Sequence, residues 1–150
     1  MESAQAILQN LVHMLAAYIL ALPIGWNRER MSQGAGLRTF PLVSMAACTY
    51  TLIGTSVFVD EEPLSRVLYG LIVGIGFIGG GAILKNGHRV SGTATAASIW
   101  NTGAIGAATG FELYELAVTL AIANFLTLYF LTRFKSKDSA DHGIVDEISD

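Results

Sequence analysis

The stretch from Val67 to Leu84, VLYGLIVGIGFIGGGAIL, contains no charged residue and is the most apolar run of the chain. A helix needs about 20 apolar residues to cross the hydrocarbon core of a bilayer, and roughly 17–25 are observed. The run is long enough to meet this requirement. It therefore predicts a transmembrane helix, and the sequence on either side repeats the same pattern.

Four further uncharged runs accompany this one, and together they predict spans at about 4–24, 40–59, 67–84, 93–110 and 116–132. The run at 93–110 is rich in Ala, Thr and Gly and only weakly hydrophobic, so a re-entrant segment is the main alternative there. The chain is 52% hydrophobic and 14% charged, whereas soluble domains are about 25% charged. We expect an all-α, polytopic transmembrane helical bundle that occupies residues 1–134.

The charged residues are sorted between the gaps that separate these runs. Eight of the nine basic residues fall in three stretches, namely Arg28, Arg30 and Arg38, then Lys85 and Arg89, then Arg133, Lys135 and Lys137. The alternate gaps hold Glu2, Asp60, Glu61, Glu62, Glu112 and Glu115. Because Lys and Arg accumulate in cytoplasmic loops, this sorting predicts five spans with the N-terminus outside and the C-terminus in the cytoplasm. Four spans would place the last basic stretch outside. The acidic tail at 135–150 is predicted to be disordered.

Glycines are concentrated in the third and fourth runs. Gly74–Gly79 matches the dinucleotide pattern G-x-G-x-x-G, but that pattern requires a preceding strand and an acidic residue about 20 positions later. Residues 90–111 contain no Asp or Glu, so we reject this interpretation. Close helix packing through small residues explains the glycines better, and we assign it to Gly70, Gly74, Gly76, Gly79, Gly80, Gly81, Gly106 and Gly110. At Gly79–Gly81 the alternative is a helix break whose carbonyl groups coordinate an ion.

Asn86-Gly87 lies between the third and fourth runs and predicts a tight turn. The two helices that it joins should therefore be antiparallel neighbours. Asn124 in the last run and His13 in the first are predicted to be structural rather than ligating.

Four motifs follow one another in a fixed order: Ile24-Gly25-Trp26-Asn27-Arg28-Glu29, Ala35-Gly36-Leu37-Arg38-Thr39, Gly74 through Gly81, and Gly92 through Trp100. Over about residues 15–130 the chain resembles the bacterial MgtC/SapB family. Some members carry Glu where this chain has Asn27, and their usual Leu-Thr-Thr reads Thr93-Ala94-Thr95 here. Many relatives also have a soluble C-terminal domain, which we expect this chain to lack.

The resemblance implies a multi-pass protein of the bacterial cytoplasmic (inner) membrane that is linked to growth in low magnesium. Some members resemble regulators that bind other membrane proteins, including the F-type ATP synthase. A regulator that packs its helices against such a partner or against copies of itself is therefore one hypothesis. The alternative is an oligomeric channel or carrier for magnesium, potassium or protons, although no run carries an acidic residue at full depth. We expect no enzymatic activity, no cofactor and no nucleic-acid partner, because the sequence has no nucleophile–base set and no Walker motif.

The candidates for a functional site or an ion pathway are Arg28, Glu29, Arg38, Thr39, Thr95 and Asn101. Glu29 is either half of a loop ion pair, a cation ligand or a buried partner of Arg38, while both arginines also fit simple loop anchors. Asn101 lies mid-span, where polar side chains usually face the bundle interior. Gly36 can adopt a positive φ and so predicts a structured turn before Thr39. No set of metal ligands stands out.

Overall fold

Within the described residues, the computed structural model has five α-helices and one β-hairpin. In chain order these are α1 (Glu2–Met31), α2 (Thr39–Val57), α3 (Glu61–Gly81), β1 (Leu84–Asn86), β2 (Arg89–Ser91), α4 (Thr93–Gly110) and α5 (Tyr114–Asp146). The structure describes the backbone of residues 2–31, 34–87 and 89–146, and the side-chain surroundings of 3–31, 34–87 and 90–131. The predicted all-α class is confirmed.

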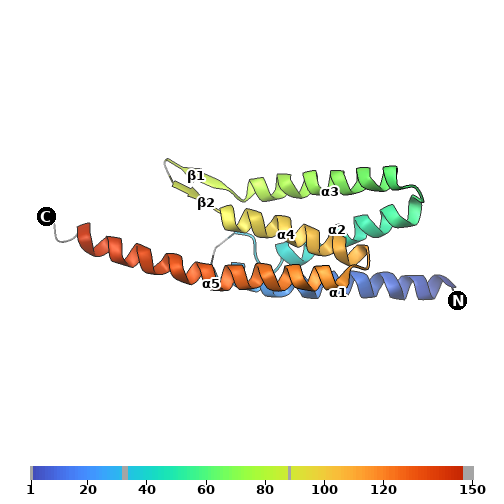
Figure 1. Cartoon of the computed structure of the whole chain (residues 1–150), viewed down its shortest axis with the longest axis horizontal. Helices are drawn as coiled ribbons and strands as arrows, with labels where there is room; N and C mark the ends of the chain where they lie inside the picture. The colour runs from blue at the N-terminus through green and yellow to red at the C-terminus, as the bar shows by residue number, and fades with distance from the viewer. Residues whose placement is uncertain (1, 32–33, 88, 147–150) are drawn as a thin grey trace.

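The helices lie side by side and alternate in direction (Figure 1). α1, α3 and α5 run toward the β-hairpin, while α2 and α4 run away from it, so the chain begins and ends at opposite ends of the bundle. We call the end that carries β1 and β2 the hairpin end. Arg28, Arg38 and Lys85 belong to this end, whereas Asp60 and Glu112 lie in the connections at the opposite end.

Four helices are long and apolar enough to cross a membrane: Ser3–Met31, Thr39–Val57, Glu61–Gly81 and Tyr114–Leu131. The predicted fourth span, 93–110, is a helix with the expected bounds, but its Ala, Thr and Gly residues make it less apolar. A count of five crossings and the orientation of the termini therefore stay predictions. The side chains of Glu2, Arg89, Arg133, Lys135 and Lys137 lie outside the described residues. The disordered tail at 135–150 also stays a prediction.

α4 is the central helix and contacts α1, α2, α3 and α5. Its buried residues run without a gap from Ile105 to Gly110, whereas α3 buries only Ile75 and Gly79. One stripe of α4, formed by Ala97, Trp100 and Ala104, is exposed. Because its other faces meet protein rather than lipid, α4 does not need the apolar surface that the outer helices have.

Small residues bring α2 and α4 into close parallel contact. A Cβ added at Gly106 would overlap the backbone carbonyl of Ser44, and one at Gly110 would lie 2.8 Å from the carbonyl oxygen of Cys48. These two contacts are one helical turn apart on each helix. Packing of this type is typical of membrane helices, which gain no hydrophobic stabilisation from association in lipid.

The other glycines assigned to packing fall into two groups. A Cβ added at Gly79 would lie 3.1 Å from the carbonyl oxygen of Ala96, so α3 meets α4 there. No described atom beyond the local backbone comes within 4 Å of a Cβ added at Gly70, Gly74, Gly76, Gly80 or Gly81. These five glycines therefore leave part of α3 without a packing partner in the described part of the chain.

The predicted Asn86-Gly87 turn is part of the β-hairpin. Asn86 pairs with Arg89 and Lys85 with Val90 in an antiparallel register, and Gly87 has a φ of 59°. The expectation that the third and fourth helices are antiparallel neighbours is confirmed (Figure 1). The sequence analysis did not predict the two strands, because each has only three residues.

α3 remains helical through Gly81, so the three consecutive glycines lie at its end and do not break it. The carbonyl groups of Gly79 and Gly80 accept hydrogen bonds from the N–H groups of Ala82 and Ile83, at 3.0 and 3.1 Å. These carbonyl groups therefore terminate the helix, in the manner usual for helix C-termini.

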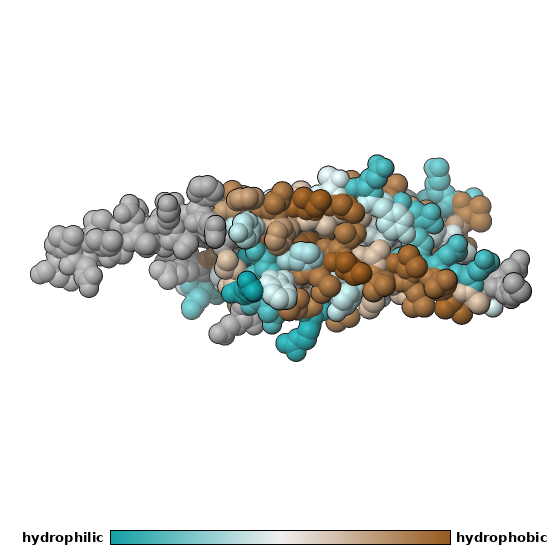
Figure 2. All heavy atoms as spheres, turned by 90° about the horizontal axis from the view of Figure 1, so that it is seen from below, coloured by the Kyte–Doolittle hydropathy of each residue, from teal (hydrophilic) through white to brown (hydrophobic). Residues whose placement is uncertain are grey.

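Large apolar side chains cover the outer surface between the two ends. Leu15, Ile53, Phe77 and Leu126 are all exposed, each from a different helix. Figure 2 shows this apolar surface running along one face of the molecule. Contiguous apolar surface on this scale is typical of a membrane-facing protein.

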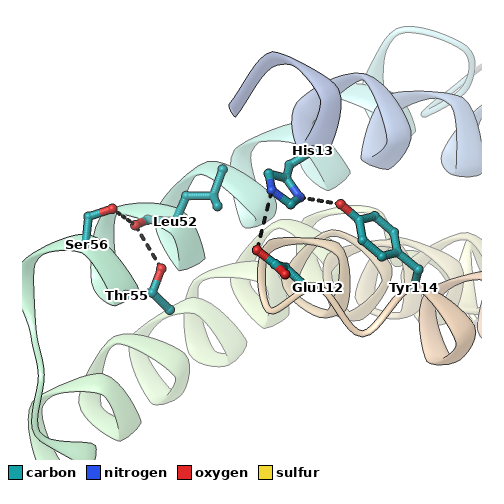
Figure 3. A network of polar contacts seen from close by, with 6 residues as sticks. All are labelled: His13, Leu52, Thr55, Ser56, Glu112 and Tyr114. Carbon is teal, nitrogen blue, oxygen red and sulfur yellow. Dashed lines mark hydrogen bonds and ion pairs between the residues drawn. The ribbon is translucent and has the colours of Figure 1, made fainter. Parts of the chain in front are cut away.

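A polar contact joins α1 to the α4–α5 connection at the end opposite the hairpin (Figure 3). Nδ1 of His13 is hydrogen-bonded to the hydroxyl group of Tyr114, and the two rings stack with centroids 5.8 Å apart. Nε2 of His13 lies 3.8 Å from Oε1 of Glu112, which has a φ of 62° in the turn. The same view shows the hydroxyl groups of Thr55 and Ser56 donating to the carbonyl group of Leu52.

Candidate functional site

The hairpin end of the bundle contains a cavity of about 1090 Å³, formed where α1 ends and α4 begins. Three of the six predicted site residues, Arg28, Thr39 and Thr95, line it. Further hydroxyl groups come from Ser91, Thr93 and Thr127, and an apolar wall comes from Ile78, Ile99 and Leu131. Among the described lining residues there is no Asp or Glu. The cavity therefore combines one cationic side chain with neutral polar groups and apolar surface.

Arg28 is enclosed by the protein and is only 6% exposed. Its Nε has no hydrogen-bond partner, and no ion pair joins it to another described residue. The neighbouring Asn27 is also buried, with an unpaired Oδ1. Burial of an unpaired charge costs several kcal/mol as an order of magnitude. Arg28 is therefore a buried hydrogen-bond donor beside a cavity. A basic residue that only anchors a loop would instead be exposed to solvent.

The side chain of Glu29 stabilises the loop between α1 and α2. Its Oε2 accepts a hydrogen bond from the N–H of Leu37 at 3.0 Å, and a Cβ added at Gly36 would overlap its carboxylate. The predicted turn is present, since the carbonyl group of Gly36 accepts from the N–H groups of Thr39 and Phe40. The positive φ expected at Gly36 is wrong: the described glycines with positive φ are Gly87 and Gly92. Glycine at position 36 leaves room for the carboxylate of Glu29, and a Cβ there would also lie 3.1 Å from the backbone Cα of Glu29.

Removal of the Glu29 carboxylate should loosen this loop. We expect Glu29→Ala to lower the free energy of unfolding by about 1 kcal/mol, because the N–H of Leu37 loses its acceptor. Glu29→Gln keeps an acceptor oxygen and should lose less than half of that amount. Chemical unfolding of the purified variants in detergent measures both. Equal losses would show that the negative charge, and not the hydrogen bond, is what matters.

The remaining two predicted residues lie apart from the cavity. Arg38 is exposed and lines a separate apolar groove of about 760 Å³ between α2 and α3. Asn101 is partly buried and lies beside Trp100, which is 53% exposed, so its place in an ion pathway stays a prediction. Ser98 and Thr102 occupy the inward face. Neither Glu29 nor Asn101 is among the residues that line the cavity, whereas Gly81 is.

A buried polar contact links α4 to α5 one helical turn from the cavity. The Oγ of Ser98 donates to Oδ1 of Asn124 at 3.3 Å, and Nδ2 of Asn124 is enclosed without a partner. The described residues include no group of three or more His, Cys, Asp or Glu side chains that could hold a metal ion. The polar interior near the cavity is therefore neutral apart from Arg28.

The sequence analysis did not assign the N-terminus of α4 to the site. Gly92, with a φ of 83°, directly precedes the helix, and no side chain caps it. The first helical hydrogen bond runs from the N–H of Ala96 to the carbonyl group of Gly92 at 2.8 Å. The N–H groups of Thr93, Ala94 and Thr95 therefore precede the helical ladder, and all three residues line the cavity. Unpaired N–H groups give a helix N-terminus a partial positive charge.

The helical bundle, its apolar outer surface and its four helices able to cross a bilayer define an integral membrane protein. The sequence model of the MgtC family matches residues 14–137. The chain belongs to the MgtC family, which confirms the resemblance carried by the four motifs.

Several curated relatives are similar to the chain. Protein SrpB of Synechococcus elongatus is 38% identical over 135 residues, which cover 81% of this chain and 72% of SrpB. YhiD of Escherichia coli K12, named as a candidate magnesium transporter, is 34% identical over 79% of this chain and 58% of its own length. Protein MgtC of Brucella abortus is 36% identical over 73% of this chain and 45% of its own length. The match thus spans less than two thirds of the last two relatives. No solved structure is significantly similar.

Proposed function

We propose that this MgtC-family protein crosses the bacterial inner membrane five times, with the N-terminus outside and the hairpin end in the cytoplasm. Arg28, Arg38 and Lys85 belong to the hairpin end, and basic residues accumulate on the cytoplasmic side. The alternating helix directions support the same arrangement (Figure 1).

α4 serves as the fifth crossing in this proposal. It is one continuous helix that starts at the hairpin end and finishes beside the turn that carries Glu112. A weakly apolar helix is tolerated at this depth when its neighbours are protein. The contacts of α4 with α1, α2, α3 and α5 meet that condition.

Within the membrane the protein acts as a non-enzymatic regulator of other membrane proteins or of ion homeostasis, in adaptation to low magnesium. The observation that carries this proposal is the free glycine surface of α3, formed by Gly70, Gly74, Gly76 and Gly80. Gly70 and Gly74 also line the apolar groove between α2 and α3. Small residues let a second transmembrane helix approach closely, so this surface fits a helix of a partner protein or of another copy.

An oligomeric cation channel or carrier is the second candidate, favoured by the name of the relative YhiD. Its expected ligands are already engaged: Glu29 accepts from Leu37, and the carbonyl groups of Gly79 and Gly80 accept from Ala82 and Ile83. The large cavity also carries a buried arginine in place of a carboxylate. These features favour the regulator.

The test of the regulator is Gly74→Leu, which fills the groove between α2 and α3. Association with partner helices, measured by crosslinking in native membranes, should fall at least tenfold, and growth in low magnesium should fail. The melting temperature of the purified chain should not fall, because no described atom lies within 4 Å of a Cβ added here and leucine is a better helix former than glycine. Val118→Leu, which adds bulk at an exposed position of α5, is the matched control and should change neither property.

Ion flux decides between the two candidates. Proteoliposomes that hold only the purified protein should show no saturable flux of magnesium, potassium or protons. Saturable flux that is lost in both Glu29→Gln and Asn101→Leu would establish the channel or carrier instead.

A further inference from the structure

We propose that the cavity at the hairpin end binds a phosphate group, held by Arg28 and by the N-terminus of α4. The phosphate belongs either to a phospholipid headgroup or to a soluble phosphate compound, because both present the same charged oxygen atoms. This ligand site goes beyond the regulator proposal and does not rest on it.

The first support is the unpaired charge of Arg28. A guanidinium group stays protonated in proteins and offers five N–H donors in a planar fork. The Arg28 residue is only 6% exposed, and its Nε has no hydrogen-bond partner. The nearby carboxylate of Glu29 is bonded to Leu37 and does not line the cavity. No described carboxylate therefore neutralises Arg28 in the cavity.

The second support is independent of Arg28. Thr93, Ala94 and Thr95 bring the uncapped N-terminus of α4 to the same cavity. Helix N-termini bind phosphate groups because their free N–H groups and the helix dipole both favour an anion. Two donors of different kinds, from α1 and from α4, thus line one space.

The chemistry of the lining narrows the ligand to an oxyanion of this type. The arginine fork matches the geometry of phosphate oxygens, and the hydroxyl groups of Ser91 and Thr127 add neutral donors. Ile78, Ile99 and Leu131 form an apolar side that fits the glycerol and acyl region of a lipid. A bare cation would find no described carboxylate there and would be repelled by Arg28.

The experiment measures phosphate binding to the purified full chain in a maltoside detergent, which contains no phosphate. One arm titrates inorganic phosphate against chloride at equal ionic strength. The other titrates dioctanoyl phosphatidylglycerol against dioctanoylglycerol, which has the same chains and no phosphate. Calorimetry gives the affinity in each arm. Binding in the first arm alone identifies a soluble phosphate compound, and binding in the second alone identifies a lipid headgroup.

Arg28→Gln should lower the phosphate affinity at least tenfold. Arg30→Gln is the matched control, because Arg30 is on the same helix and exposed, lies over the Trp26 ring at 4.9 Å, and does not line the cavity. Its affinity should equal that of the unmodified chain. Without ligand, Arg28→Gln should melt no lower than the unmodified chain, because it removes an unpaired buried charge. An arginine with a purely structural role would lower the melting temperature when replaced.

Several results would overturn the proposal. The unmodified chain would bind neither probe above its control, or Arg28→Gln and Arg30→Gln would lose affinity equally. If Arg28→Gln does not fold, Arg28→Met decides, since it keeps an unbranched apolar stem and loses the charge and every donor. Its affinity should fall at least tenfold, and an unchanged value would exclude Arg28 as the phosphate donor. None of these results depends on a partner protein, so they test the phosphate site independently of the regulator proposal.

Discussion

Gly106→Ala is expected to lower the free energy of unfolding by about 3 kcal/mol, the upper part of the range for overpacking. A methyl group at this position overlaps the carbonyl group of Ser44 and comes within 2.9 Å of the Cβ of Ala47. The opposing atom is backbone and cannot rotate away, so α2 and α4 must separate. The direction of the change in stability is informative. Alanine is a better helix former than glycine by about 1 kcal/mol, so the same substitution would stabilise a helix without a close packing partner.

The matched control is Gly76→Ala on α3. No described atom lies within 4 Å of its added Cβ, so the helix propensity of alanine acts alone and the variant should gain up to about 1 kcal/mol. Unfolding of both variants in mixed micelles gives the two values. A loss of the same size at Gly76 would mean that glycine is needed for helix geometry and not for the α2–α4 contact.

Gly92→Ala is expected to cost about 3 kcal/mol, because two penalties act at this position. The left-handed conformation, with a φ of 83°, costs an L-residue about 1–2 kcal/mol. The added Cβ also overlaps the carbonyl group of Ala82. We expect faster hydrogen exchange at the start of α4 together with the loss of stability.

Gly87→Ala separates the two penalties. Gly87 also has a positive φ, of 59°, but no described atom lies within 4 Å of its added Cβ. The free energy of unfolding of this variant should therefore fall by about 1–2 kcal/mol, from the conformational cost alone. If the two variants lose equal stability in the same unfolding assay, the contact between Gly92 and Ala82 is not important.

The secondary structure could be predicted largely from apolar run length. The run at 93–110 and α4 have the same bounds, and Asn86-Gly87 correctly joins two antiparallel neighbours. The packing of the glycines could be predicted only in part. Gly106 and Gly76 look alike in sequence, and what distinguishes them is which helix lies opposite, a long-range property of the fold.

The candidate site shows the same limit. A basic residue at the end of a span predicts a loop anchor, and only the arrangement of α1 and α4 shows that Arg28 is enclosed beside a cavity. The prediction for Asn101 rested on the usual inward orientation of polar residues in a span, and the structure places this residue between the buried and exposed faces of α4. The exposed stripe of α4 passes through Trp100 and Ala104 and leaves Asn101 at its edge.

The central place of α4 has a consequence for biosynthesis. Ribosomes make α4 before α5, so Ser98 leaves the ribosome before its partner Asn124. A lone segment of this composition partitions poorly into lipid, while the β-hairpin keeps it beside the more apolar α3. We therefore expect α3 and α4 to leave the translocation machinery as a pair. Their integration is complete only when α5 has been synthesised.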